Sequence, residues 1–281
     1  RAQAMRATTT SNATAPPNIL LYLIDDMDLE RFPFYPRFDY GAAAQLDVHK
    51  QGKGCSTGAA SCNYSAPHID SIGVNGVRFL GAHVPVSVCT PSRYAVLTGR
   101  LPSSAPFYSA TKVGHFDAEG TVDISWNTYI TMGIGPTCTA TRWWGCERRS
   151  QTIGDMLHRA AYFTGFVGKW HLSGVPPKVN EYTHGRHGRM NPDPQTPAEV
   201  AAQADLQRGF EEARQEMHDY IRAAGFNYTG SLSVGNVVDL SGLGVAKHNV
   251  EWETDAGLRF LRLGAAHVAA GRADAFYLHL C

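Results

Sequence analysis

Three short apolar runs limit the possible folds of this chain more than any other feature of its sequence. The first is Asn-Ile-Leu-Leu-Tyr-Leu-Ile at residues 18–24, and similar runs follow at residues 162–167 and 275–280. Each run is too short for a core helix and is largely continuous in apolar character, which is typical of strands buried in a parallel sheet. The three runs therefore predict three buried strands.

Helical patterns lie between these runs. One helix is expected to start at Ser150 or Gln151, and another runs from about residue 250 to residue 270. A third has Thr196 as its N-cap and Pro197 as its first helical residue, a combination that favours the start of a helix. The sequence thus predicts an α/β fold, with a mostly parallel central sheet flanked by helices.

The remaining segments give weaker signals. Residues 67–84 are expected to form a helix, a glycine turn and then a strand over Val77–Val84. Residues 29–67 mix aromatic, Gly and Ser residues without clear periodicity, and residues 101–150 form another loop-rich region, so we expect loops in both. Residues 1–16 are too polar for a signal-peptide core and are expected to be disordered.

The overall composition argues against two classes of partner. The chain has 281 residues, a formal net charge of zero and 43% hydrophobic residues. A neutral chain has no long-range field that would draw it to nucleic acid or to an anionic membrane. No apolar run approaches the roughly 20 residues that span a bilayer, so no transmembrane segment is predicted.

Two acidic residues follow the first predicted strand directly. Asp25 and Asp26 stand where open α/β sheets gather their ligand sites, at the carboxyl end of a strand. Adjacent carboxylates there repel each other unless a hard cation lies between them. The alternative is a solvated turn, since acidic residues are common in such loops.

The cysteines and the glycosylation sequons point to an oxidising compartment. Cys55 and Cys62, and Cys138 and Cys146, form two close pairs in the sequence, although four cysteines allow three pairings; Cys281 is left over. Sequons at Asn63 and Asn227, with a third at Asn12, add to this signal. We expect two local disulfides, glycosylation and a secretory protein in an extracellular or lysosome-like compartment.

One dozen residues carry the strongest chemical signal. Residues 89–100 read Cys-Thr-Pro-Ser-Arg-Tyr-Ala-Val-Leu-Thr-Gly-Arg. Pro91 and Ser92 suit the first turn of a helix, so Cys89 would lie at a helix N-terminus, where backbone N–H groups favour an anion. A buried cysteine beside a capped helix is the structural alternative.

This string resembles the signature of the type I sulfatase family, Cys-x-Pro-Ser-Arg-x-x-x-Leu-Thr-Gly-Arg, at every fixed position. The resemblance implies an alkaline phosphatase-like sandwich. It also implies that a formylglycine-generating enzyme oxidises Cys89 to 3-oxoalanine (formylglycine), whose hydrate is the nucleophile. Residues 17–281 would then be the N-terminal portion of a sulfatase catalytic domain.

A second motif of the family follows the second predicted strand. Residues 168–172 read Gly-Lys-Trp-His-Leu, although Ser173 stands where the family usually has Gly. In an extended segment Lys169 and His171 would share one face while Trp170 packs the other way. A cation beside an imidazole suits an anionic substrate, whereas a Lys-x-His pair alone is more often a surface feature.

The resemblance also implies a mechanism. Asp25, Asp26 and the formylglycine from Cys89 would hold one Ca²⁺ or Mg²⁺ ion, which binds a sulfate oxygen. Arg93 and Lys169 would steady the nucleophile and the sulfate, and His171 would transfer a proton or hold the aldehyde hydrate. One hydroxyl of the hydrate would attack sulfur, and the other would then expel sulfate.

Alternatives to this function remain open in the sequence. A hydrolase of the same fold could cleave phosphate or phosphonate esters instead, and the chain could also be a catalytically incomplete relative. The family has a further histidine, an Asp-Asn pair and a smaller C-terminal domain after its third strand, and the sequence contains none of these. We therefore expect a fragment that binds metal weakly and turns over aryl sulfates hardly at all.

Overall fold

The structure is a computed structural model. It describes the backbone of residues 107–116 and 122–131 and, elsewhere, residues 15–25, 67–79, 81–86, 88–105, 151–172, 195–233 and 250–281. Two compact units are present. The larger contains Arg1–Leu23 and Pro85–Cys281, and the smaller contains Ile24–Val84.

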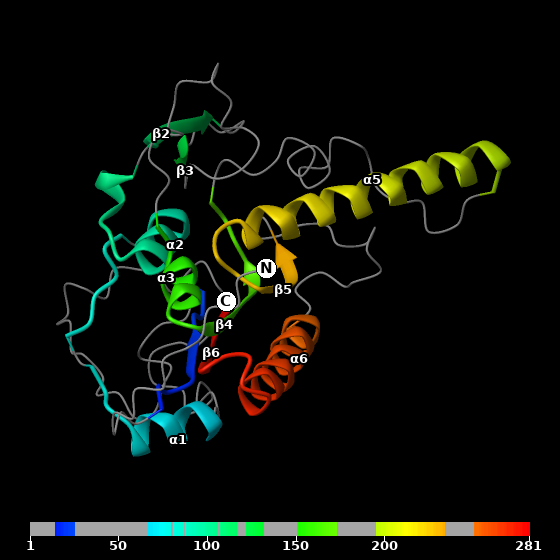
Figure 1. Ribbon diagram of the computed structural model, residues 1–281. Coiled ribbons are helices and arrows are strands. Elements are labelled where there is room, and N and C mark those ends of the chain that lie inside the picture. The colour runs from blue at the N-terminus through cyan, green and yellow to red at the C-terminus, as the bar shows by residue number, and fades with distance from the viewer. Residues whose placement is uncertain are drawn as a thin grey trace. The chain divides into compact units, whose positions relative to one another are not determined.

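A four-stranded parallel sheet forms the centre of the larger unit (Figure 1). Its strand order is β1 (Ile19–Tyr22), β6 (Ala275–Leu280), β4 (Tyr162–Lys169) and β5 (Tyr228–Ser233). Every neighbouring pair in this order is parallel. The carboxyl ends of all four strands therefore meet at one edge, which we call the carboxyl edge.

The two faces of the sheet bury different side chains. On β6, Ala275 and Tyr277 belong to one hydrophobic core, whereas Leu278 belongs to the other and Phe276 packs against that same second core. This alternation follows from the two-residue period of a strand. Because both faces are covered by helices, the inner strands are apolar almost throughout, as the sequence predicted.

Helices cover both faces of the sheet. The first core contains buried residues of α2 (Cys89–Thr98) and α5 (Pro197–Arg222), with α3 (Ile153–Arg159) packed against it. The second core is closed by α6 (Val250–Ala269) through Phe260. Figure 1 shows α6 on the opposite side of the sheet from α2 and α3. The α/β fold with a mostly parallel sheet is therefore confirmed.

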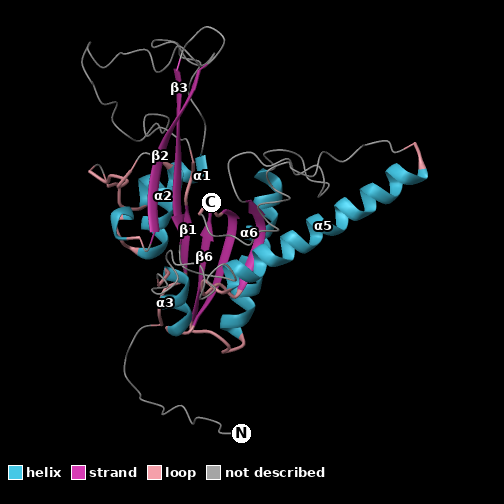
Figure 2. Ribbon diagram, turned by 90° about the horizontal axis from the view of Figure 1, so that it is seen from above, coloured by secondary structure: helices cyan, strands magenta, loops and turns pink. Residues whose placement is uncertain are grey.

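The predicted start of α5 is confirmed in detail, whereas α3 begins at Ile153, later than the expected Ser150 or Gln151. Thr196 is the N-cap of α5, with Pro197 at its first position, and Thr152 caps α3. Both helices have a capping box. The hydroxyl of the N-cap Thr accepts a hydrogen bond from the backbone N–H three residues further on, and the acidic side chain of that residue accepts one from the backbone N–H of the Thr. The amino-terminal part of α5 extends beyond the sheet (Figure 2).

Four elements of the larger unit were missed by the sequence interpretation. Residues 101–150 were expected to be loops, but β2 (Phe107–Phe116) and β3 (Val122–Thr131) form an antiparallel hairpin within them, paired from Phe107 with Thr131 to Phe116 with Val122. A short 3-10 helix, η3 (Pro102–Ser104), precedes β2. Strand β5 also carried no recognised signal.

Two other predictions need correction. Strand β1 is parallel as expected, but it is an edge strand, and Leu20 and Tyr22 are 53% and 54% exposed rather than buried. In the smaller unit, α1 (Pro67–Asn75) is the predicted helix. The expected strand Val77–Val84 is wrong, because its described residues, 77–79 and 81–84, adopt no strand.

Among the described helices, none combines the length and the apolar character that a membrane crossing requires.

Candidate active site

Cys89 is the first residue of α2, as the sequence predicted. Val88 precedes it in extended conformation as the N-cap, without a side-chain cap. The Ser92 hydroxyl instead donates to the backbone carbonyl of Val86, which fixes the chain entering the helix. Cys89 is half-buried and is not joined to another described cysteine. Its side chain therefore starts at the positive end of the helix dipole.

The same helix ends as its sequence requires. Gly99 adopts the left-handed conformation with φ of 66°, and its N–H donates to the carbonyl of Ala95 at 2.8 Å. Thr98 donates its hydroxyl to the carbonyl of Tyr94 at 2.7 Å. Tyr94 and Leu97 are fully buried in the first core. The fixed Leu-Thr-Gly of the string thus anchors and terminates the helix that carries Cys89.

Arg93 connects this helix to the carboxyl edge of the sheet. Only 3% of its surface is exposed, and its Nη1 donates to the carbonyl oxygen of Lys169 at 2.5 Å. The same nitrogen lies 3.0 Å from Sγ of Cys281, which follows β6. The two sequence motifs, 76 residues apart, are therefore brought together by one charge-assisted hydrogen bond.

Gly168 permits the backbone turn that presents Lys169. Its φ is 101°, and a Cβ atom added there would lie 1.6 Å from the carbonyl oxygen of Cys281. That oxygen accepts a hydrogen bond from the Lys169 N–H at 2.9 Å. The register of β4 against β5 also shifts between Val167 and Lys169. Only glycine allows this close approach between the ends of β4 and β6.

The rest of the second motif departs from a regular strand. Trp170 is fully buried against Phe166 and Tyr220, so its predicted inward packing is confirmed. His171 has a φ of 50°, however, and β4 ends at Lys169. The simple alternation expected for Lys169 and His171 is therefore wrong in its geometry. Lys169 is 9% exposed and His171 is half-buried.

His279 is a buried residue near Arg93 that the sequence interpretation treated only as part of a strand. Its ring stacks on Phe166 at 5.0 Å, and its Nδ1 lies 3.0 Å from the hydroxyl of Tyr277. Burial lowers the pKa of His279 to about 3, and the positive charge of Arg93 adds to this effect. Burial also raises the pKa of Tyr277.

Cys281 is the second residue whose position was missed. Its Sγ lies 3.2 Å from the carbonyl of Lys169, and its N–H donates to the carbonyl of Val167 at 3.0 Å. The only signal in the sequence was its place directly after a predicted strand, where side chains reach the carboxyl edge. His279 could have been noticed as an ionisable residue in an otherwise apolar run.

Several predicted residues belong to the other unit or lie outside the described residues. Asp25 belongs to the smaller unit, and Asp26 lies outside the described residues. Among the residues described, no three His, Cys, Asp or Glu side chains form a group that could hold a metal ion. The predicted disulfide and glycosylation residues Cys55, Cys62, Cys138, Cys146 and Asn63 also lie outside the described residues.

Asn227 is the predicted glycosylation residue that the structure describes. It is exposed, and its Oδ1 accepts from the N–H and the hydroxyl of Thr164 at 3.0 and 2.9 Å. Thr229, the third residue of the sequon, is buried, and its hydroxyl lies 2.6 Å from Nδ1 of His218. The side-chain oxygen of Asn227 therefore helps to hold β4 beside β5.

Comparison with known proteins gives a consistent result. Residues 50–223, well over half of the chain, match the family described as Sulfatase. Bovine arylsulfatase A is 32% identical over 167 residues, which cover 59% of this chain and 23% of that protein. Arylsulfatase of Hemicentrotus pulcherrimus is 35% identical over 146 residues, 52% of this chain and 22% of that protein. Human N-acetylgalactosamine-6-sulfatase is 28% identical over 175 residues, 62% of this chain and 25% of that protein.

The matched part of the chain thus spans about a quarter of these relatives. The parallel sheet with helices on both faces agrees with the alkaline phosphatase-like fold that the resemblance implied. The matched region includes both motifs, and Arg93 and Lys169 join them in space. The chain therefore belongs to the sulfatase family.

Proposed function

We propose that the protein containing this chain is a sulfuric ester hydrolase that cleaves sulfate monoesters. The observation that supports this most is the hydrogen bond from Arg93 to the carbonyl of Lys169 at 2.5 Å. It places the helix that starts at Cys89 beside the segment that carries Lys169 and His171. A nucleophile precursor at a helix N-terminus next to cationic side chains suits an ester that carries negative charge.

Each residue has a definite role in this proposal. Cys89 provides the nucleophile after oxidation of its side chain to the aldehyde of formylglycine. Arg93 holds the carboxyl ends of β4 and β6 against α2 and contributes a fixed positive charge. Lys169 binds a sulfate oxygen through its ammonium group, and His171 holds or moves a proton on the nucleophile or the leaving alcohol.

A divalent cation is the second part of the proposal. The carboxylates of Asp25 and Asp26 offer the hard oxygen ligands that Ca²⁺ and Mg²⁺ prefer, and the nucleophile residue would add a further oxygen. When bound, one such ion would withdraw charge from the sulfate group. The support for it is the position of these acids shortly after β1 in the sequence, together with the family resemblance.

The proposed cellular setting follows from the sequence. We propose local disulfides between Cys55 and Cys62 and between Cys138 and Cys146, and a secretory route to an extracellular or lysosome-like compartment. Asn63 and Asn227 are the proposed glycosylation sites. A formylglycine-generating enzyme would be the partner during maturation. Because relatives are named as an arylsulfatase and as an N-acetylgalactosamine-6-sulfatase, the substrate is proposed to be an aryl or a carbohydrate sulfate.

The assay that tests this function compares an aryl sulfate with the matching aryl phosphate. Full-length protein from a host that has the maturation enzyme should hydrolyse the sulfate faster. Cys89→Ala should abolish turnover, and Lys169→Met should lower it about 10²- to 10³-fold, the usual cost of losing one positioned donor. As a matched control, Arg208→Met changes a cation on the exposed side of α5 and should leave turnover unchanged.

Two results would contradict the proposal. Faster hydrolysis of the phosphate would assign the protein to the phosphate or phosphonate ester hydrolases of the same fold. Turnover that survives Cys89→Ala would show that Cys89 is not the source of the nucleophile.

A further inference from the structure

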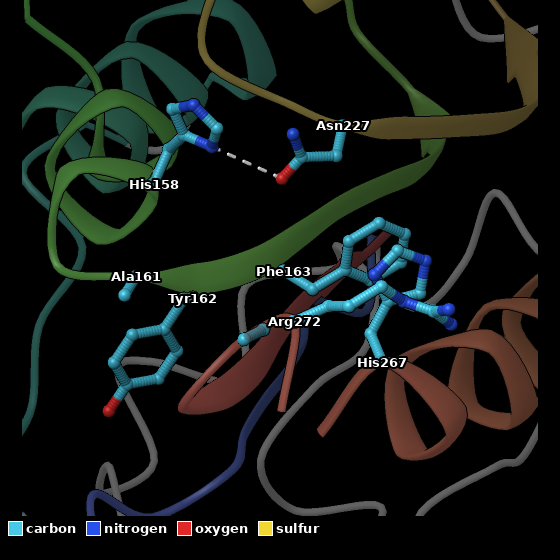
Figure 3. A pocket seen from close by; sticks show the side chains of 8 residues that line it. His158, Ala161, Tyr162, Phe163, Asn227, His267 and Arg272 are labelled. Carbon is cyan, nitrogen blue, oxygen red and sulfur yellow. Dashed lines mark hydrogen bonds between the residues drawn. The ribbon is translucent and has the colours of Figure 1, made fainter. Parts of the chain in front are cut away.

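A pocket of about 380 Å³ opens where β4 and β6 begin, at the opposite end of the sheet from Lys169 (Figure 3). None of the residues proposed for catalysis lines it. The eight lining residues come from the ends of α3 and α6, the start of β4, and the segments before β5 and β6: His158, Ala161, Tyr162, Phe163, Asn227, His267, Arg272 and Ala273.

The walls of this pocket are held by hydrogen bonds within the fold. The N–H of Asp274 donates to the carbonyl of Ala161 at 2.9 Å, which ties the entry of β6 to that of β4. The N–H of Arg272 donates to the carbonyl of His267 at 2.9 Å, which fixes the chain leaving α6. The pocket is therefore formed before any ligand binds, as is usual for small-molecule sites.

Asn227 offers hydrogen-bond donors to this space. Its Oδ1 lies 3.3 Å from Nδ1 of His158 and accepts both bonds from Thr164. Its amide nitrogen has no acceptor among the residues that the structure describes, and an amide nitrogen can donate twice. Figure 3 shows His158 and Asn227 together on one side of the segment where β4 starts.

Arg272 and His267 line the other side of that segment (Figure 3). The His267 ring stacks on Phe163 at 4.1 Å, which fixes the orientation of its imidazole nitrogens. Arg272 is exposed and carries a permanent positive charge. None of the eight lining residues is acidic. The lining therefore favours a ligand that bears negative charge and accepts hydrogen bonds.

The volume indicates how large this ligand is. A water molecule occupies roughly 30 Å³ in the liquid, so the pocket has room for roughly a dozen water-sized groups. A bare oxyanion would leave more than half of that space to solvent, whereas an oxyanion attached to a sugar ring would fill it. Sugar hydroxyls could also accept from the Asn227 amide and from the imidazoles.

We propose that this pocket binds a sulfated sugar unit, as a substrate-holding subsite separate from the catalytic residues. The choice of sulfate over phosphate rests on the proposed function, while the choice of an anionic sugar rests on the lining itself. Such a subsite would retain a polysaccharide through a unit remote from the ester being cleaved. The proposal thus selects carbohydrate sulfates over small aryl sulfates as the natural substrates.

Ligand-detected and protein-detected NMR can test this with four probes: galactose 6-sulfate, galactose 6-phosphate, galactose and inorganic sulfate. Galactose 6-sulfate should bind best and should shift the imidazole resonances of His158 and His267, assigned by substitution. Arg272→Gln should weaken this binding at least about tenfold, because it removes a charge-assisted hydrogen bond to the ligand. Arg262→Gln, on the exposed surface of α6, is the matched control and should change nothing.

The outcomes separate the pocket from the catalytic site. Binding that is equal for galactose, unchanged by Arg272→Gln, or lost in Lys169→Met would overturn the proposal. Tighter binding of the phosphate would overturn its sulfate part. A third outcome would also overturn the proposal: Arg272→Gln could lower the melting temperature without lowering the affinity. The basic lining residues would then stabilise the carboxyl-terminal ends of α3 and α6 and would not bind a ligand. Failure of Cys89→Ala to abolish turnover would refute the proposed function but leave these measurements unaffected.

Glycosylation must be controlled in this experiment because Asn227 lines the pocket. Asn227 is also a proposed glycosylation site, and a glycan on its amide nitrogen would occupy this space, so the proposed subsite belongs to molecules that carry no glycan at Asn227. Protein from a host without N-glycosylation should bind galactose 6-sulfate. Protein shown by mass spectrometry to be glycosylated at Asn227 should bind it much more weakly, and equal binding by the two forms would overturn the placement of the ligand.

Discussion

Gly168 is the residue on which the junction between β4, β6 and α2 depends most directly. Its positive φ, and the 1.6 Å that would separate an added Cβ from the Cys281 carbonyl oxygen, leave no room for a side chain. The hydrogen bonds of Lys169 and Arg93 both depend on this turn. The structure therefore explains why the second motif has a glycine at position 168, which the sequence pattern alone does not explain.

Gly168→Ala should consequently destabilise the protein by roughly 3 kcal/mol or more, because it combines an unfavourable backbone conformation with a clash against backbone. Gly99→Ala is the matched comparison, since Gly99 has a φ of 66° but nothing within 4 Å of an added Cβ. It should cost only about 1 kcal/mol. Urea unfolding of both variants measures the difference, and equal costs would contradict the close approach at Gly168.

His218 should make stability depend on pH. Burial, with Arg214 and Arg222 adding to it, lowers the pKa of His218 to about 4 in the fold, whereas an unfolded His titrates near 6.5. Between these values the unfolded chain binds the extra proton, so stability falls as the pH drops from about 6.5 to about 4. Allowing for partial exposure, the loss should be up to about 2 kcal/mol.

Comparison of unfolding free energies at about pH 7 and about pH 4.5 tests this. His218→Gln should flatten part of the pH dependence. Some dependence should remain in His218→Gln, because the lowered pKa of His279 acts in the same direction. An unchanged pH slope in His218→Gln would show that the imidazole is not neutral in the fold.

At the scale of elements, the two capping boxes provide a natural comparison. Thr152 is fully buried, and besides capping α3 it donates its hydroxyl to the carbonyl of Ala224 at 2.5 Å. Thr196 caps the exposed start of α5 and makes no such tertiary bond in its described contacts. Local capping is therefore the same in both, and only Thr152 joins two parts of the core.

Thr152→Ala should cost roughly 2–3 kcal/mol, because it removes a cap and leaves a buried carbonyl without its donor. Thr196→Ala should cost about 1 kcal/mol or less. The difference is measurable by thermal or denaturant unfolding. If the two substitutions cost the same, the bond from Thr152 to Ala224 contributes nothing to stability.

The elements also show how far sequence reasoning reaches. Runs such as Ala275–Leu280 were recognised because both faces of an inner strand are apolar. Strand β5 (Tyr228–Ser233) contains Thr, Gly and two Ser residues, so its extended form depends on pairing with β4 rather than on its own pattern. The β2–β3 hairpin was missed for a different reason, because in β3 Val122, Ile124 and Trp126 alternate with polar residues, a pattern that favours a strand and was overlooked.

For the whole molecule, the sequence indicates candidate site residues but not how they contact one another. Cys89, Arg93, Lys169 and His171 were identified from two motifs, but neither motif predicts that Arg93 bonds to a backbone carbonyl. That contact requires β4 to end beside α2, which only the assembled sheet determines. The Gly-Lys-Trp-His-Leu motif suits an extended strand, so it did not predict the left-handed backbone conformation of His171 either.

Mass spectrometry of the tryptic peptide Phe79–Arg93 tests the central claim most directly. In protein from a host that has the formylglycine-generating enzyme, Cys89 should carry an aldehyde in place of its thiol, and the peptide should react with a carbonyl reagent such as a hydrazide. The Cys89→Ala peptide should not react and serves as the control. An intact thiol at Cys89 throughout, or a disulfide from Cys89 to another cysteine, would contradict the account of this protein as a formylglycine-dependent sulfatase.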